Sequence, residues 1–180
     1  MRKLPHFLDR GDHCCAFYKN EGEKLRLLIP FFRAGLLLGE KCLYVASHDD
    51  FQKIQKALRT HKSYHHDIDE EKIMHIDASI YSEAAQSGSP ADLCEQMRQI
   101  LEAFMVEGYK GMRGAGCLEM DFTPVFEDFI LEYERLVSSL FKDYPVSGIC
   151  LYPHSRFNTS FGRKIAAIDC HPVTVDPLTV

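Results

Sequence analysis

The chain has 180 residues, 46% of them hydrophobic and 26% charged, a length and composition that fit one globular domain with a buried core. Its net charge of -5 argues against general binding to nucleic acid or to anionic membranes, which requires a basic surface. We therefore predict a single domain over residues 1–180 that makes no direct contact with nucleic acid or membrane.

The N-terminus and the cysteines indicate a cytoplasmic protein with reduced thiols. Residues 1–6 are not followed by the apolar stretch of a secretory signal, and the longest apolar run, near residues 25–38, is interrupted by two arginines and a proline. The cysteines number seven, which is odd, and nothing in the chain points to secretion. A disulfide framework is therefore not expected.

Strand and helix patterns alternate through the first half of the chain. Residues 13–18 read as a strand, and residues 21–38 carry apolar side chains at helical spacing. Pro30 lies inside this helix and predicts a kink or a break there. Residues 41–47 are apolar on both faces, which is typical of a strand in a covered parallel sheet. A short helix is expected after residues 47–50, which offer N-capping side chains.

The same alternation continues through the second half. Further strands are expected at residues 72–77, 111–117 and 146–152. Helices begin at Pro90 and Pro124, each directly after an N-capping Ser or Thr. Residues 79–89 read as a loop or irregular turn, and residues 166–175 as one or two further strands at the edge of the sheet.

This order of elements predicts a three-layer α/β/α domain with a mainly parallel central sheet and right-handed crossovers. A nucleotide-binding protein of this kind places its phosphate loop at the first strand-to-helix turn. Here that turn contains one glycine, Gly22, and Lys24 is followed by Leu25 instead of Ser or Thr. We expect a P-loop-type topology without a working Walker A motif, no ATP hydrolysis and no cofactor.

Ligands of such a sheet bind beyond the carboxyl ends of its strands, where several polar side chains are expected. Arg156 suits a carboxylate or phosphate group, and Glu119 is the best placed carboxylate, with a ligand-binding and a structural role both open. The residues that we expect to line the pocket are Tyr18, Asn20, Glu119, Tyr152 and Arg156.

His13 and Cys15 are two residues apart on one strand, so they share a face. They are secondary candidates for the pocket. With Cys150 and His171 they would supply four ligands for zinc, if their strands are neighbours. No C-x-x-C pair supports this metal site, and a hydrogen-bonded core histidine beside a buried thiol is the favoured interpretation. A nucleophilic Cys/His pair also stays open.

The chain resembles the MEDS (methanogen/methylotroph sensory) domain family over nearly its whole length. The opening strand resembles the family's His-x-Cys-x-x-Tyr motif, and Glu119-Met120 is similar to a Gly-Glu-Met site in which Leu118 replaces the glycine. The other matching segments are residues 28–36, 39–45, 131–134, 150–152, 156–157 and 171–172.

The resemblance implies a RecA-like α/β domain that has no functional phosphate loop. It implies a sensory module of transcription regulators and signalling proteins that recognises small hydrocarbon derivatives. We therefore expect a non-catalytic sensor that acts through a protein signalling partner or a fused output domain, with homo-oligomerisation left open. The alternatives are a degenerate ATPase fold kept as a protein-interaction module, a Cys/His metal or redox sensor, and an enzyme with Glu119 as its base.

Overall fold

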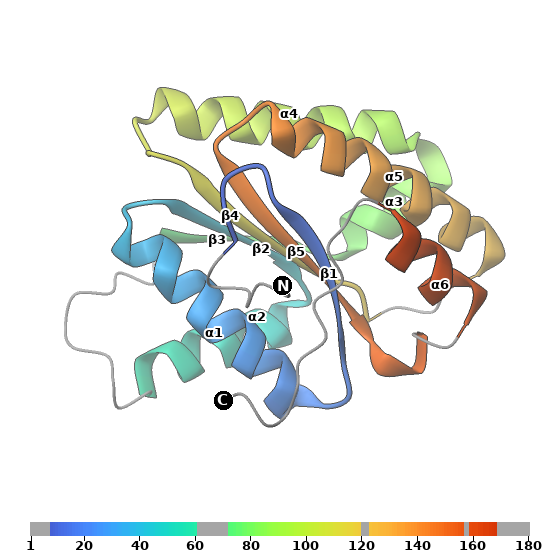
Figure 1. Ribbon diagram of the computed structural model, residues 1–180, viewed down its shortest axis with the longest axis horizontal. Helices are drawn as coiled ribbons and strands as arrows, with labels where there is room; N and C mark the ends of the chain where they lie inside the picture. Colours follow the sequence, from blue (N-terminus) through green and yellow to red (C-terminus); the bar gives the residue numbers. More distant parts are fainter. Residues whose placement is uncertain (1–7, 61–71, 120–122, 157–158, 169–180) are drawn as a thin grey trace.

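The computed structural model describes residues 8–60, 72–119, 123–156 and 159–168. They form an α/β fold around a five-stranded sheet in the order β1-β5-β4-β2-β3 (Figure 1). Every neighbouring pair of strands in this sheet is parallel. The strands are β1 (His13–Tyr18), β2 (Lys41–Ala46), β3 (Ile73–Asp77), β4 (Met112–Cys117) and β5 (Val146–Pro153).

Helices cover both faces of the sheet, as Figure 1 shows. One face carries α1 (Glu21–Leu37) and α2 (His48–Thr60). The opposite face carries α3 (Ser79–Ser87), α4 (Pro90–Val106), α5 (Pro124–Lys142) and α6 (Ser160–Ala167). A short 3-10 turn, η3 (His154–Arg156), follows β5. No helix in the described ranges is both long and apolar enough to cross a membrane.

Alternate residues of each strand point to two separate hydrophobic cores. On β1, Cys14, Ala16 and Tyr18 belong to the core beneath α1 and α2. Cys15 and Phe17 belong to the core beneath α3 to α6. This alternation decides which polar side chains of the sheet can meet each other.

The five predicted strands are confirmed to within one residue at either end. The expected N-caps are confirmed for α4 and α5: the side chain of Ser89 accepts a hydrogen bond from the Asp92 amide, and that of Thr123 from the Phe126 amide. The parallel sheet flanked by helices is therefore as predicted, whereas the RecA-like strand order stays a prediction.

Two local predictions are wrong, and of the kink or break expected at Pro30 the break is excluded. Residues 79–87, predicted as a loop, form the helix α3. Its residue Tyr81 packs in the core and is only 3% exposed. The helix is not broken at Pro30, since α1 is continuous and the flanking Ile29 and Phe31 are buried against the sheet. Ala166 and Ala167 end α6 instead of starting a strand, and the rest of that predicted strand, residues 169–175, lies outside the described residues.

The connections place a crevice at the carboxyl edge of the sheet. The chain leaves β2 into α2 on one face, and it leaves the neighbouring β4 toward α5 on the other face. Loops that part in this way leave room between them, which is where open parallel sheets bind their ligands. Ser47 follows β2 and Glu119 follows β4, so both lie at this switch point.

Candidate functional site

A buried lysine near the start of α1 is the centre of the site at the carboxyl edge. The side chain of Lys24 is 3% exposed, and its Nζ lies 2.5 Å from Asp50 Oδ1 and 2.7 Å from Glu119 Oε1. Asp50 comes from α2 and is also buried, whereas the Glu119 side chain is 46% exposed. One ammonium group therefore ties α1 to α2 and to the segment after β4.

Two tyrosines complete the hydrogen bonding of these carboxylates. The Tyr18 hydroxyl donates to Glu119 Oε1 at 2.7 Å, and the Tyr44 hydroxyl donates to Asp50 Oδ2 at 2.5 Å. Burial is the main reason that the pKa of each tyrosine lies far above its usual value. Both phenols therefore stay protonated and act as donors.

The site carries fixed charges at neutral pH. Burial opposes the charged form of Lys24, but Cys117, Asp50 and Glu119 around it raise its pKa above the usual value. Burial likewise opposes ionisation of Glu119, but hydrogen bonds from Lys24 and Tyr18 hold its pKa below the usual value. Two carboxylates thus surround one ammonium group, which leaves the cluster with an excess negative charge.

A pocket of about 350 Å³ opens beside this cluster. It lies at the ends of β2, β3 and β4, and Asp77 adds a third carboxylate to its wall. Its polar lining consists of Ser47, Asp50, Asp77, Ser79, Cys117 and Glu119. Such a volume accommodates a small organic molecule, and such a lining favours hydrogen-bond donors or a positive charge over anions.

The position of Lys24 explains why a phosphate group is a poor ligand here. Lys24 lies in the first turns of the helix that follows β1, where a phosphate-binding protein presents a lysine to its ligand. Here its ammonium group is already bonded to Asp50 and Glu119. A triphosphate would compete with both carboxylates and would meet the charge of Asp77.

The edge cluster is also a poor metal site. Ligand atoms of Asp50, Cys117 and Glu119 lie within 4.8 Å of one another. However, the ammonium group of Lys24 bonds both carboxylates and so holds the position that a cation would need. In addition, burial raises the pKa of the Cys117 thiol to about 12, so the thiolate form that binds metals is suppressed.

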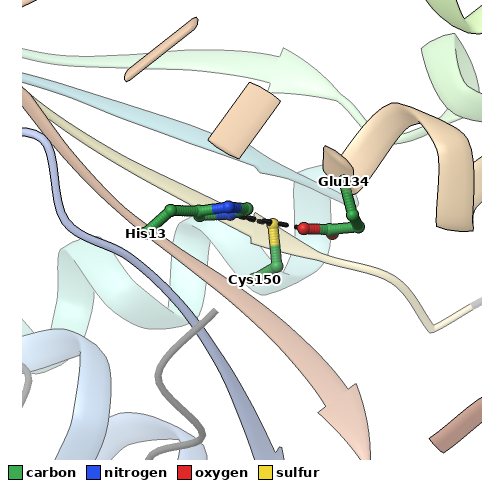
Figure 2. Close-up of side chains that lie close together, drawn as sticks. All are labelled: His13, Glu134 and Cys150. Carbon is green, nitrogen blue, oxygen red and sulfur yellow. Dashed lines mark hydrogen bonds and ion pairs between the residues drawn. The ribbon is translucent and has the colours of Figure 1, made fainter. Parts of the chain in front are cut away.

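A second polar cluster lies on the opposite face of the sheet, beneath α5 (Figure 2). His13 Nε2 lies 3.3 Å from Cys150 Sγ and 3.3 Å from Glu134 Oε2. Cys15 Sγ lies 3.9 Å from the same oxygen of Glu134. The Tyr152 hydroxyl donates to Glu134 Oε1. All five side chains are buried, since none of these residues is more than 7% exposed.

The structure divides the predicted pocket residues between these two places. Tyr18 and Glu119 meet at the carboxyl edge. His13, Cys15 and Tyr152 belong to the cluster beneath α5.

The two remaining predicted residues have other contacts. Asn20 caps α1, because its side chain accepts a hydrogen bond from the Glu23 amide at 3.0 Å. Arg156 lies in η3, with its guanidinium 3.9 Å from Glu127. Neither of these contacts joins its residue to the edge cluster, so a role for Asn20 or Arg156 in ligand binding stays a prediction.

The predicted metal ligands are brought together in part. Cys15 and Cys150 are register partners on the neighbouring strands β1 and β5, and His13 contacts Cys150. His171 lies outside the described residues.

Four residues of these clusters were not predicted from the sequence: Lys24, Tyr44 and Asp50 at the edge and Glu134 beneath α5. One signal was available, because Lys24 and Glu134 are charged residues on helix faces that are otherwise apolar. Lys24 is followed at helical spacing by Leu28 and Phe31, and Glu134 is preceded by Ile130, all of them buried.

Comparison with known proteins agrees with the fold and the motifs. The family model described as MEDS, the MEthanogen/methylotroph, DcmR Sensory domain, matches residues 12–172, and the chain belongs to this family. The chain is also 24% identical over 144 residues to the transcriptional repressor DcmR of Methylorubrum extorquens (strain DSM 6343 / CIP 106787 / DM4). The match covers 78% of this chain and 51% of the relative, so the chain spans about half the length of that protein.

Proposed function

We propose that this chain is a non-catalytic sensory domain that binds a small molecule in the pocket at the carboxyl edge and acts in transcription regulation or signal transduction. Membership of a sensory-domain family supports this function, as does the similarity to a protein named as a transcriptional repressor. The observation that carries it is the ion pairing of Lys24 with Asp50 and Glu119, two carboxylates that line a pocket of about 350 Å³.

The acidic lining suggests the class of ligand. Asp77 and Glu119 offer carboxylate oxygens to a hydroxyl or amine group, and Ser47 and Ser79 offer hydroxyl groups. A small hydrocarbon derivative that carries a hydroxyl or amine group matches this lining. A carboxylate or phosphate ligand, the kind of group that Arg156 would suit, does not match it.

Glu119 connects the ligand to the protein. Its side chain is half-exposed, yet one of its oxygens accepts hydrogen bonds from Lys24 and from Tyr18. A ligand that competes for Glu119 changes the bonds between the segment after β4 and α1. A signal follows if the two arrangements bind the ligand with different affinity, and a protein partner or fused output domain reads the difference.

Catalysis receives little support from the edge cluster. Burial opposes ionisation of Glu119, but hydrogen bonds from Lys24 and Tyr18 lower its pKa below the usual value. This carboxylate is therefore a weak base at neutral pH. The Cys117 thiol, whose pKa burial raises to about 12, is a poor nucleophile. We propose that this sensor has a RecA-like fold without a working Walker A motif, acts in the cytoplasm and uses no cofactor.

A thermal-shift screen tests the function. The probes are short-chain alcohols and amines, with ATP and Mg²⁺ as the competing class. A ligand that binds only the folded state raises the melting temperature, and we expect this for alcohols or amines with the unmodified protein and not with Glu119→Gln. Glu132→Gln on α5 is the matched control, since the Glu132 side chain is about half exposed and pairs only with nearby Arg135 among the contacts described for it.

Two results would contradict the proposal. Stabilisation by ATP with Mg²⁺ would indicate a nucleotide site. Stabilisation by an alcohol or amine that Glu119→Gln leaves unchanged would place the ligand elsewhere in the domain.

A further inference from the structure

We propose that the buried cluster beneath α5 is a site for a divalent transition metal of the zinc type, with His13, Cys150 and Glu134 as ligands. The site lies in the core beneath α5 and shares no residue with the lining of the edge pocket, so this inference is independent of the function proposed above. Figure 2 shows the imidazole of His13, the thiol of Cys150 and the carboxylate of Glu134 pointing toward one another.

The distances match the edges of a zinc tetrahedron. With zinc bonds of about 2.0–2.1 Å to nitrogen and oxygen and about 2.3 Å to sulfur, ligand atoms lie roughly 3.3–3.6 Å apart. His13 Nε2 lies 3.3 Å from Glu134 Oε2 and 3.3 Å from Cys150 Sγ. The ligand atoms of these three residues all lie within 4.8 Å of one another, whereas Cys15, whose Sγ is 3.9 Å from Glu134 Oε2, lies outside this group.

The ligand types select the metal. Thiolate and imidazole groups favour zinc and its neighbours over magnesium or calcium, which prefer oxygen ligands. A carboxylate in an apolar core is costly unless an opposite charge neutralises it, and Glu134 is 1% exposed. A divalent ion would neutralise Glu134 together with a cysteine thiolate.

The outer contacts are those that metal ligands have in proteins. The remaining ring nitrogen of His13, Nδ1, lies 2.7 Å from Ser138 Oγ, which can accept a hydrogen bond from Nδ1–H when Nε2 binds a metal. The second oxygen of Glu134 accepts a hydrogen bond from the Tyr152 hydroxyl. Residues of this outer layer orient metal ligands, and their loss typically weakens metal binding by about 10–100-fold.

Glycine on β5 makes room for the histidine. A Cβ atom at Gly148 would lie 3.2 Å from His13 Cδ2 and 2.2 Å from Phe141 Cε2, so a side chain there would displace both rings. A void of about 20 Å³ adjoins His13 and Cys150, which is enough for an atom of the size of a water molecule. The cluster therefore has the ligand spacing that a bound ion requires, and Gly148 leaves room for the His13 ring.

Titration with Co²⁺ tests the site in the full chain, prepared without a histidine tag and stripped with a chelator. Cobalt replaces zinc and shows a near-ultraviolet absorption when it is bound by a thiolate. We expect one equivalent to bind with this absorption, and Zn²⁺ to displace it and raise the melting temperature. The absorption should be lost in Cys150→Ser and kept in Cys42→Ser, whose thiol is buried beneath α1.

A second variant covers the case in which Cys150→Ser does not fold. Tyr152→Phe keeps all three ligands and should weaken cobalt binding by about 10–100-fold through its loss of the bond to Glu134. The proposal is overturned if no thiolate absorption appears in the unmodified protein, if the absorption persists in folded Cys150→Ser, or if Tyr152→Phe binds cobalt as tightly as the unmodified protein.

Discussion

Replacing Lys24 by methionine tests whether the ion-paired cluster holds the carboxyl edge together. Lys24→Met keeps the length of the side chain and removes its charge, which leaves Asp50 buried beside a second carboxylate. Removing one partner of a buried ion pair costs about 3–5 kcal/mol, because the other charge stays in the interior without compensation. At about 2–4 °C per kcal/mol for a chain of this size, the melting temperature should fall by roughly 6–20 °C.

Urea unfolding followed by circular dichroism measures this change in the free energy of unfolding. The matched control is Lys53→Met, because Lys53 pairs with Glu21 on the same pair of helices with both side chains about half exposed. We expect a much smaller effect from this control. The double variant Lys24→Met with Asp50→Asn should recover part of the loss. If Lys24→Met were no more harmful than Lys53→Met, the charges at the edge would not stabilise the domain.

Three further predictions follow from single contacts. Burial opposes the ionised form of Glu119, but hydrogen bonds from Lys24 and Tyr18 keep its folded pKa below the usual value. The contribution of Glu119 to stability is therefore complete at neutral pH and is lost as the pH falls through that folded pKa. The free energy of unfolding, measured against pH, should fall less steeply at acid pH for Glu119→Gln than for the unmodified protein. Gly148→Ala should lower the free energy of unfolding, measured in urea, by about 1–3 kcal/mol, because the added Cβ would lie 2.2 Å from Phe141. Gly114→Ala is the control, since the nearest atom to its added Cβ is 3.6 Å away and no overpacking is expected. Burial raises the pKa of Cys117 to about 12, so iodoacetamide should alkylate this thiol slowly in the folded protein and fast in urea, as followed by mass spectrometry. Fast alkylation of the folded protein would favour the enzyme alternative.

The strands were predictable because their residues are apolar on both faces and are bounded by polar turns. The helix α3 was missed because its sequence is short and rich in small polar residues, with an N-cap position, Ala78, that offers no side-chain hydrogen bond. The packing of Tyr81 against Tyr133, at 5.7 Å between ring centres, and the hydrogen bond from the Ser79 amide to Asp77 show how this segment is held as a helix.

The site was predictable in part, and the reason lies in the two faces of each strand. Residues at strand ends were grouped by their position at the edge of the sheet, which correctly brought Tyr18 and Glu119 together. The same grouping put Tyr152 with them, although it points to the opposite core. The contact of Glu134 with His13 depends on β1 and β5 being neighbours, and local sequence patterns do not encode strand order.

The most direct measurement of the sensor function is two-dimensional amide NMR of the isotopically labelled chain during titration with the alcohols and amines that pass the thermal screen. We predict that the shifted amides cluster around Ser47, Asp77, Ser79 and Glu119 at the carboxyl edge, and that Glu119→Gln abolishes the shifts. Shifts that arise only with ATP and Mg²⁺, or that lie away from this edge, would contradict the proposed ligand site.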